Sequence, residues 1–437
     1  MNRKLKVGLA ILGGVAALLV AAHLVENLRG RHAWRSWKRA RLAAGDRIDP
    51  AAFAPPVLPE ADNFAAAPLI AEAVQGRRPG PQVPSALGEP RLMGSWREGR
   101  RSDLAALKDT LKVQDLDAFL APYGAELEAL AEAARRPGCR LPVDYGAPMA
   151  VPPQWLGMRA RARLLALRAL VRLEQGKSEA ALEDVLTGLR VAGRLQREPH
   201  LITQLLRLAW ANILLQPVWE GLEARCWSAS QLERLQAALE RVDLVASWRQ
   251  AVLYEGCGSV SSFEAVVEKN AILRGWAYQN LVRMGGWWYQ NAEVMDSVRH
   301  RFRPEAEEPL RRMARARRTP YNFMLESLPA MLGQNQRMAR TQSGLDQARV
   351  ACALERFRLA KGAYPERLEA LVPGFLPEVP GDVIEGQALC YTRLRPDAFR
   401  LYSPGWNRQD EGGRLVLEAG GRSDPGRGDW PWTGSQR

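Results

Sequence analysis

Apolar residues recur at the three- and four-residue spacing of an α-helix along most of the chain. The clearest stretch is 158–195, in which one face carries Ala160, Leu164, Leu167 and Val171. Gly176 is expected to end this helix, and Ser178 to cap the helix that follows. The pattern therefore predicts an αα-hairpin, set in a helical domain that covers residues 102–344.

The rest of this domain is also predicted to be helical. A capping box is expected to open one helix, formed by Ser228 with Gln231 or by Ser230 with Glu233. Farther along, the sequence GCGSVSS at 256–262 predicts a flexible break between two helices. The 158–195 hairpin is similar to one tetratricopeptide-type unit, but the pattern does not recur at a fixed period, so a generic hairpin is the preferred interpretation.

The first 41 residues read as a membrane anchor followed by a juxtamembrane helix. Residues 7–25 contain no charge, and nineteen helical residues just cross a hydrocarbon core of about 30 Å. A cleaved signal peptide is the alternative, because Val20, Ala21 and Ala22 resemble a cleavage site. In the juxtamembrane helix, Trp34 and Trp37 are expected near the lipid headgroups.

Basic residues flank the apolar segment on both sides. Arg3, Lys4 and Lys6 precede it, and a cluster at 29–41 follows it, so the positive-inside rule does not decide the orientation. The signal-like start favours export of the body. We therefore expect a single-pass protein of the inner (cytoplasmic) membrane with its body in the periplasm.

Proline and glycine mark the segment between the anchor and the helical domain. Residues 42–101 are predicted to be a Pro/Gly-rich linker, extended over 50–68 and forming a loop over 77–90.

The pattern changes near the end of the chain. After an apolar helical stripe over 350–360, Gly362 and Pro365 stop the helix. Alternating segments at 387–394 and 398–403 predict an antiparallel hairpin, with a third strand expected at 413–418. The overall fold class is thus mainly α: an N-terminal transmembrane helix, an α-helical hairpin body and a small α+β domain with an antiparallel sheet over 345–437.

Composition narrows the classes of partner. The net charge of +13 and the pI of about 9.9 favour anionic partners. The basic run at 299–318, however, contains three glutamates and no aromatic ladder for base stacking, so nucleic acid is not expected. The 14 tryptophans are interpreted mainly as filling between helices. Cys352 and Cys390 are the first candidates for a disulfide, with two small buried apolar side chains as the alternative.

The segments ALERFRLAKGAYPERLEALVP, FLPEVPGD, LCYTRL, FRLYSPGWNRQDEGG and GDWPW together resemble the C-terminal portion of type II secretion pseudopilins. The chain is also similar to uncharacterised membrane-anchored proteins of planctomycete- and verrucomicrobium-like bacteria. The pseudopilin resemblance implies a calcium ion, Ca²⁺, held by Asn407, Asp410 and Asp429. Asn407 stands where that family usually has aspartate, and the glycine-aromatic cleavage site and early glutamate of pilin-like proteins are absent.

No catalytic constellation is visible. The four histidines lie in no HExxH sequence, and GCGSVSS is not a G-x-S-x-G nucleophile motif. We therefore expect no enzyme but a scaffold or binding protein of the cell envelope, whose partners are the membrane and envelope or secretion-system proteins. The alternative is an exported hydrolase with an unrecognised site.

Overall fold

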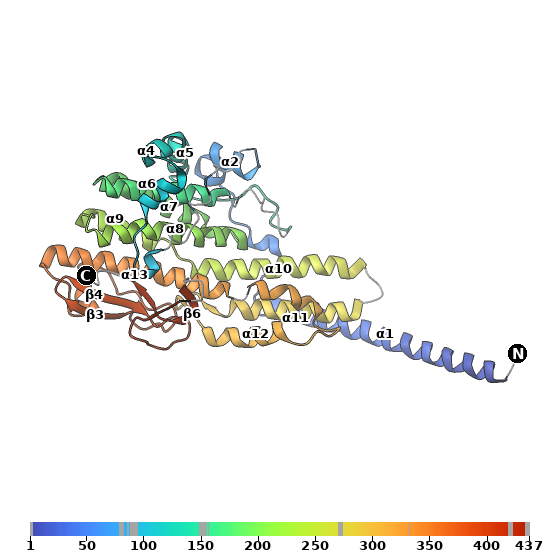
Figure 1. The fold of residues 1–437 in the computed structure, drawn as a ribbon. Helices are drawn as coiled ribbons and strands as arrows, with labels where there is room; N and C mark the ends of the chain where they lie inside the picture. The colour runs from blue at the N-terminus through green and yellow to red at the C-terminus, as the bar shows by residue number, and fades with distance from the viewer. Residues whose placement is uncertain are drawn as a thin grey trace.

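The protein is mainly helical, with one long helix projecting from the body (Figure 1). The computed structural model describes residues 3–77, 83, 84, 87, 95–147, 155, 157–269, 274–331, 333–417 and 423–432. A small C-terminal region contains antiparallel sheets. The predicted fold class is confirmed.

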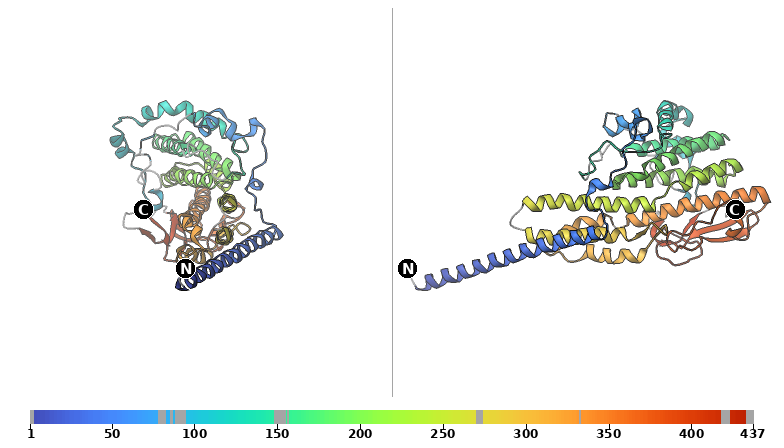
Figure 2. Two further views of the ribbon diagram at one scale, coloured as in Figure 1. Left: turned by 90° about the vertical axis from the view of Figure 1, so that its right-hand side faces the viewer. Right: turned by 180° about the vertical axis from the view of Figure 1, so that it is seen from behind.

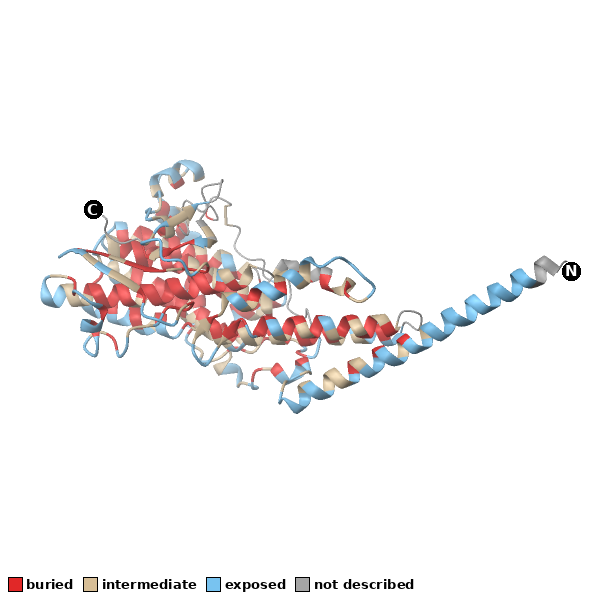
Figure 3. Ribbon diagram, turned by 90° about the horizontal axis from the view of Figure 1, so that it is seen from below, coloured by how far each residue is buried: buried red, intermediate tan, exposed pale blue. Residues whose placement is uncertain are grey.

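The projecting helix, α1 (Arg3–Ala43), has two different halves. Its apolar N-terminal half is exposed, as at Leu12 with 68% exposure, and it is long and apolar enough to span a membrane. Its C-terminal half packs along α11 (Arg274–Ala292), at one edge of the body (Figures 2 and 3). Trp34 is only 2% exposed there, so its side chain packs inside the protein and is not free to insert among lipid headgroups.

The middle of the chain forms a stack of antiparallel helices. These are α6 (Met158–Glu174), α7 (Ser178–Arg194), α8 (Leu201–Glu223) and α9 (Ala229–Glu240). Gly176 joins α6 to α7 with a φ of 73°, as the predicted hairpin requires. The capping box of Ser228 with Gln231 is confirmed. The prediction for Ser178 is wrong, because Lys177 occupies the N-cap and Ser178 is the first residue of α7.

One helix, α10 (Val245–Lys269), runs through the predicted break. Gly256 lies inside it and faces α11, where an added Cβ would lie 2.6 Å from the Cβ of Trp288. The glycine therefore permits close helix packing and does not interrupt the helix. Trp287 and Trp288 are buried, as the tryptophan interpretation expects.

The segment predicted as an extended linker carries short helices. They are η1 (Pro50–Phe53), η2 (Glu60–Asp62), η3 (Phe64–Ala66), α2 (Pro68–Val74) and η5 (Ser95–Glu98). Proline is common at the first position of a helix, which explains why this proline-rich segment can form short helices. Phe64, Ile70 and Trp96 are buried in the core, so the segment packs on the bundle. Most of the loop predicted at 77–90 lies outside the described residues.

Further short elements complete the helical region. After η5 come α3 (Leu104–Leu111), α4 (Leu116–Leu120), η6 (Ala121–Tyr123), α5 (Gly124–Ala133) and, after α7, η8 (Leu195–Arg197). After α11 come β1 (Met295–Asp296), β2 (Arg301–Phe302), η9 (Pro304–Ala306), α12 (Glu307–Arg315) and η10 (Phe323–Met331). The strands β1 and β2 pair as a short antiparallel hairpin.

The C-terminal region shares a helix with the bundle. That helix, α13 (Gln334–Lys361), packs on α8 and α9 and also contacts strands of the C-terminal region. The predicted domain boundary at residue 345 therefore lies inside α13, and buried residues of both parts form one hydrophobic core. After Gly362 the chain continues through η11 (Leu368–Leu371) to the strands.

The predicted hairpin is confirmed as β3 (Cys390–Arg395) and β4 (Ala398–Ser403). Its third strand is β7 (Trp430–Trp432), not the predicted 413–418. The latter contains β5 (Leu415–Leu417), which pairs separately with β6 (Ser423–Gly428). Burial of both β7 tryptophans explains the difference, because Trp432 packs against Trp96 at 5.2 Å between ring centroids.

All five cysteines lie in described segments and are free. Cys352 is fully buried in α13 and Cys390 is half-buried in β3. The two cysteines are therefore not linked, and only Cys352 is as buried as the alternative expects.

Replacing Gly275 by valine should separate α1 from α11. An added Cβ at this position would lie 2.4 Å from the carbonyl oxygen of Glu26, and backbone cannot yield as a flexible side chain does. We expect a loss of about 1–3 kcal/mol in the free energy of unfolding, measured by denaturation of the full chain in detergent.

Gly286→Val is the matched control, because Gly286 lies on the same helix and an added Cβ there would meet no atom within 4 Å. Equal losses from both variants would show that the α1–α11 contact contributes little to stability.

Candidate functional site

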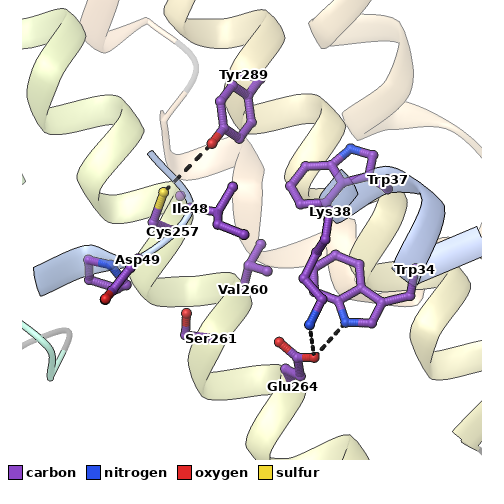
Figure 4. Close-up of a pocket in the computed structure, with 12 residues that line it drawn as sticks. Trp34, Trp37, Lys38, Ile48, Asp49, Cys257, Val260, Ser261, Glu264 and Tyr289 are labelled. Carbon is purple, nitrogen blue, oxygen red and sulfur yellow. Dashed lines mark hydrogen bonds and ion pairs between the residues drawn. The ribbon is translucent and has the colours of Figure 1, made fainter. Parts of the chain in front are cut away.

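A cavity of about 220 Å³ lies where α1 meets α10, α11 and the chain that follows α1 (Figure 4). Its lining is mixed, with aromatic and aliphatic walls and a polar group at each end. The lining residues are Trp34, Trp37, Lys38, Ile48, Asp49, Pro50, Gly256, Cys257, Val260, Ser261, Glu264 and Tyr289.

The aromatic wall comes from α1 and α11. Trp34 and Trp37 stack with ring centroids 5.0 Å apart, and Trp37 meets the edge of Tyr289 at 5.7 Å. Gly285 on α11 makes room for this wall, because an added Cβ would lie 2.6 Å from the Trp37 ring. Residues that the sequence suggested for lipid contact thus line a cavity inside the protein.

The first polar end is centred on Glu264 of α10. Its Oε1 accepts hydrogen bonds from the indole nitrogen of Trp34 at 2.6 Å and from Lys38 Nζ at 2.7 Å (Figure 4). Lys38 also lies 5.0 Å from the centre of the Trp34 ring. These contacts fasten α1 to α10 with a partly buried ion pair.

The second polar end is centred on Cys257. Its thiol donates to the carbonyl oxygen of Arg47 at 3.1 Å, and the Tyr289 hydroxyl donates to the same oxygen at 2.8 Å. Burial raises the pKa of Cys257 to about 11, and burial together with the neighbouring thiol raises the pKa of Tyr289. Both groups are therefore protonated near neutral pH.

This arrangement suits binding better than catalysis. The thiolate is the reactive form of cysteine, and a raised pKa disfavours it. The described lining residues include no histidine, and Ser261 is not bonded to a base. A mixed apolar cavity with a few polar groups is typical of a site for a small ligand or lipid chain.

Sequence reasoning missed a buried polar cluster elsewhere in the bundle. Glu198 accepts hydrogen bonds from the Tyr145 hydroxyl at 2.9 Å and from the backbone N–H of Leu141 at 2.8 Å. His200 lies 3.3 Å from Glu198, and its other ring nitrogen is 3.3 Å from the Tyr254 hydroxyl. Each of these four side chains is less than 5% exposed, so the cluster lies inside the protein and fastens the chain near Leu141 to the bundle.

The three residues expected to hold calcium lie near one another beside the C-terminal strands. The Asp429 carboxylate accepts backbone N–H groups of Glu411, Gly413 and Arg414, the closest at 2.6 Å. Asp410 accepts the N–H of Gly412 at 2.9 Å, and Asn407 accepts the N–H of Gln409 at 3.1 Å.

These oxygens therefore face hydrogen-bond donors, whereas calcium needs several oxygen ligands aimed at one point. The arrangement does not fit the ion, and it matches the turn-forming role of Asp and Asn side chains. Among the described residues, no group of three or more His, Cys, Asp or Glu is placed to hold a metal.

Asp429→Ala should loosen this loop. Asp429 is fully buried, and its loss leaves three backbone donors without their acceptor, so we expect a loss of about 3 kcal/mol in the free energy of unfolding. Chemical denaturation followed by tryptophan fluorescence measures it.

Asn407→Ala is the control for this loop, since its contacts are exposed, and it should cost less than about 1 kcal/mol. Equal effects of the two substitutions would contradict the role given to Asp429. A calcium-dependent rise in stability that Asp429→Ala abolishes would show instead that the loop binds the ion.

Alkylation tests the state of Cys257. At pH 7 iodoacetamide should modify it far more slowly than the half-buried Cys226, and its rate should rise as the pH approaches 11 because only the thiolate reacts. Mass spectrometry of the native protein at several pH values measures both sites. Rapid modification of Cys257 at pH 7 would contradict a buried, protonated thiol.

We compared the chain with protein-family models, with curated proteins and with solved structures. No protein-family model matches it, and neither a curated protein nor a solved structure matches it. The function proposed below therefore rests on the geometry of the chain itself and on the resemblance in its C-terminal segments.

Proposed function

We propose that the protein is a non-catalytic, single-pass scaffold or binding protein of the bacterial cell envelope. It is anchored in the inner membrane by α1 and carries its body on the periplasmic side. Its C-terminal α+β region would contact envelope or secretion-system proteins, as the pseudopilin resemblance suggests.

One observation carries the proposal: α1 continues without a break from an exposed apolar half into a half that is packed on the body. Exposed apolar side chains over 7–25 are unfavourable in water, and a hydrocarbon core would solvate them. Because the same helix is fastened through Gly30, Trp34 and Lys38, an anchor in the membrane would fix the position of the body.

The helix also supports an anchor that is retained. It runs without interruption through Val20, Ala21 and Ala22, the cleavage site that the alternative of a signal peptide requires. The chemistry of the cavity supports a non-catalytic role, because the Cys257 thiol and the Tyr289 hydroxyl are held protonated.

Fractionation of cells that express the full chain tests the anchor. The protein should stay in the membrane pellet after alkaline carbonate extraction, with the intact mass of an uncleaved chain. Release by carbonate, or a mass that lacks the first 22 residues, would contradict a retained anchor.

Protease treatment of spheroplasts tests the orientation in the same cells. External protease should digest the body if it is periplasmic, and a cytoplasmic marker protein should stay intact. Protection of the body would place it in the cytoplasm and remove the support for a secretion-related role.

A further inference from the structure

A second hollow, of about 350 Å³, lies beside the cavity on the side facing the N-terminus of α1. Its lining residues come from α1, α10 and α11: Arg31, Trp34, Arg35, Lys38, Glu264, Glu268, Arg274 and Tyr278. A larger open hollow on α1 shares Arg31, Arg35 and Lys38 with it and adds Arg39. One row of basic residues therefore borders both hollows.

The charges of the smaller hollow are not balanced. Glu264 is engaged by Lys38 at 2.7 Å, which leaves Glu268 as the only other carboxylate among the described residues that line the hollow. Arg31 and Arg35 form no ion pair with any residue that the structure describes. Three guanidinium groups thus face one unpaired carboxylate.

The hydrogen bonding of the Arg274 guanidinium group is a second, independent observation at this hollow. Its terminal nitrogen donates to the backbone carbonyl oxygen of Glu268 at 2.8 Å. Its Nε is buried without a hydrogen-bond partner among the described atoms. That carbonyl is the one acceptor that the described residues give Arg274, so other donors of its guanidinium group are left for an oxygen atom from outside the chain.

The distance of the hollow from the end of the apolar segment of α1 matches the position of the lipid headgroups in a membrane that α1 spans. Arg31 and Arg35 are six and ten residues past Val25, or about 9 and 15 Å along the helix axis. Side chains on a helix tilt toward its N-terminus, which for α1 is the direction of the membrane, and long arginine side chains extend farther that way. The adjoining ends of α10 and α11 point in the same direction (Figure 1).

We propose that Arg31, Arg35 and Arg274 bind the phosphate of an anionic phospholipid in the leaflet from which α1 emerges. This inference rests on the proposed membrane anchoring. Guanidinium groups suit phosphate because each offers paired donors in a planar fork. A bound headgroup would tie α1 and α11 to the surface together and set the height of the body above it.

Titration of the full chain in a neutral detergent tests this site. The probes are dihexanoyl phosphatidylglycerol, dihexanoyl phosphatidylcholine and inorganic phosphate, with the midpoint of thermal unfolding as the readout. We expect a saturable rise with the phosphatidylglycerol at concentrations at least tenfold lower than with the phosphatidylcholine. Inorganic phosphate should have little effect, and a rise as large as that from the lipid would assign the site to free phosphate and overturn the proposal.

The variant Arg31→Gln/Arg35→Gln should weaken the phosphatidylglycerol response at least tenfold. Arg159→Gln/Arg241→Gln is the matched control, because it removes the same charge from two exposed positions on the body and should leave the response unchanged. Equal responses to both lipids, or equal losses in both double variants, would overturn the proposal.

Flotation with liposomes of phosphatidylcholine alone separates this proposal from the anchor itself. The wild-type chain and both double variants should float with these liposomes, since α1 inserts without anionic lipid. If they float and the titration shows no preference for phosphatidylglycerol, only the headgroup site is wrong. If the wild-type chain does not float, the proposed anchor is wrong.

Discussion

The close packing of α1 on α11 is the contact on which the rest of the architecture depends. Gly30 and Gly275 face each other so closely that a Cβ on Gly30 would lie 2.2 Å from the Gly275 carbonyl oxygen. Asn27 then accepts the N–H of Gly275 at 2.7 Å, and Glu26 accepts a hydrogen bond from Gln279 at 2.7 Å. Small residues let two helix backbones approach and gain dispersion energy along their length. A helix that would otherwise be a flexible tether becomes part of the body.

This contact also creates the two hollows on which the functional proposals rest. Once α1 lies along α11, Trp34 and Trp37 turn inward and Lys38 reaches Glu264 on α10. The aromatic cavity forms behind these residues, and the basic hollow forms on the side toward the N-terminus. The basic hollow thus lies between the exposed apolar half of α1 and the aromatic cavity.

At the other end of the molecule, α13 joins the sheet to the bundle. One helix serves both parts, and Gln347 on it donates to the backbone carbonyl oxygen of Trp430 in β7 at 2.8 Å. Trp432 of β7 also packs on Trp96 of η5. The last described strand therefore contacts the segment 42–101, which joins the anchor to the helical bundle. Movement of the sheet relative to the anchor would break a common core.

Elements whose signal is local could be predicted from the amino-acid sequence. Helical periodicity, Gly176 and the Ser228 capping box defined the α6–α7 hairpin and the start of α9, and alternation defined β3 and β4. Features that depend on distant partners became clear only from the packing of the folded chain. Gly256 looked like a break until Trp288 was placed against it, and the buried Trp430 and Trp432 made β7 the third strand instead of 413–418. Likewise, the sequence suggested that Trp34 and Trp37 contact lipid and that Asp429 is a metal ligand. Composition does not reveal which surface or which backbone donors a side chain will contact in the fold. Burial and hydrogen bonding are set by residues far apart in the chain, so the candidate site could be located only once α1, α10 and α11 were together.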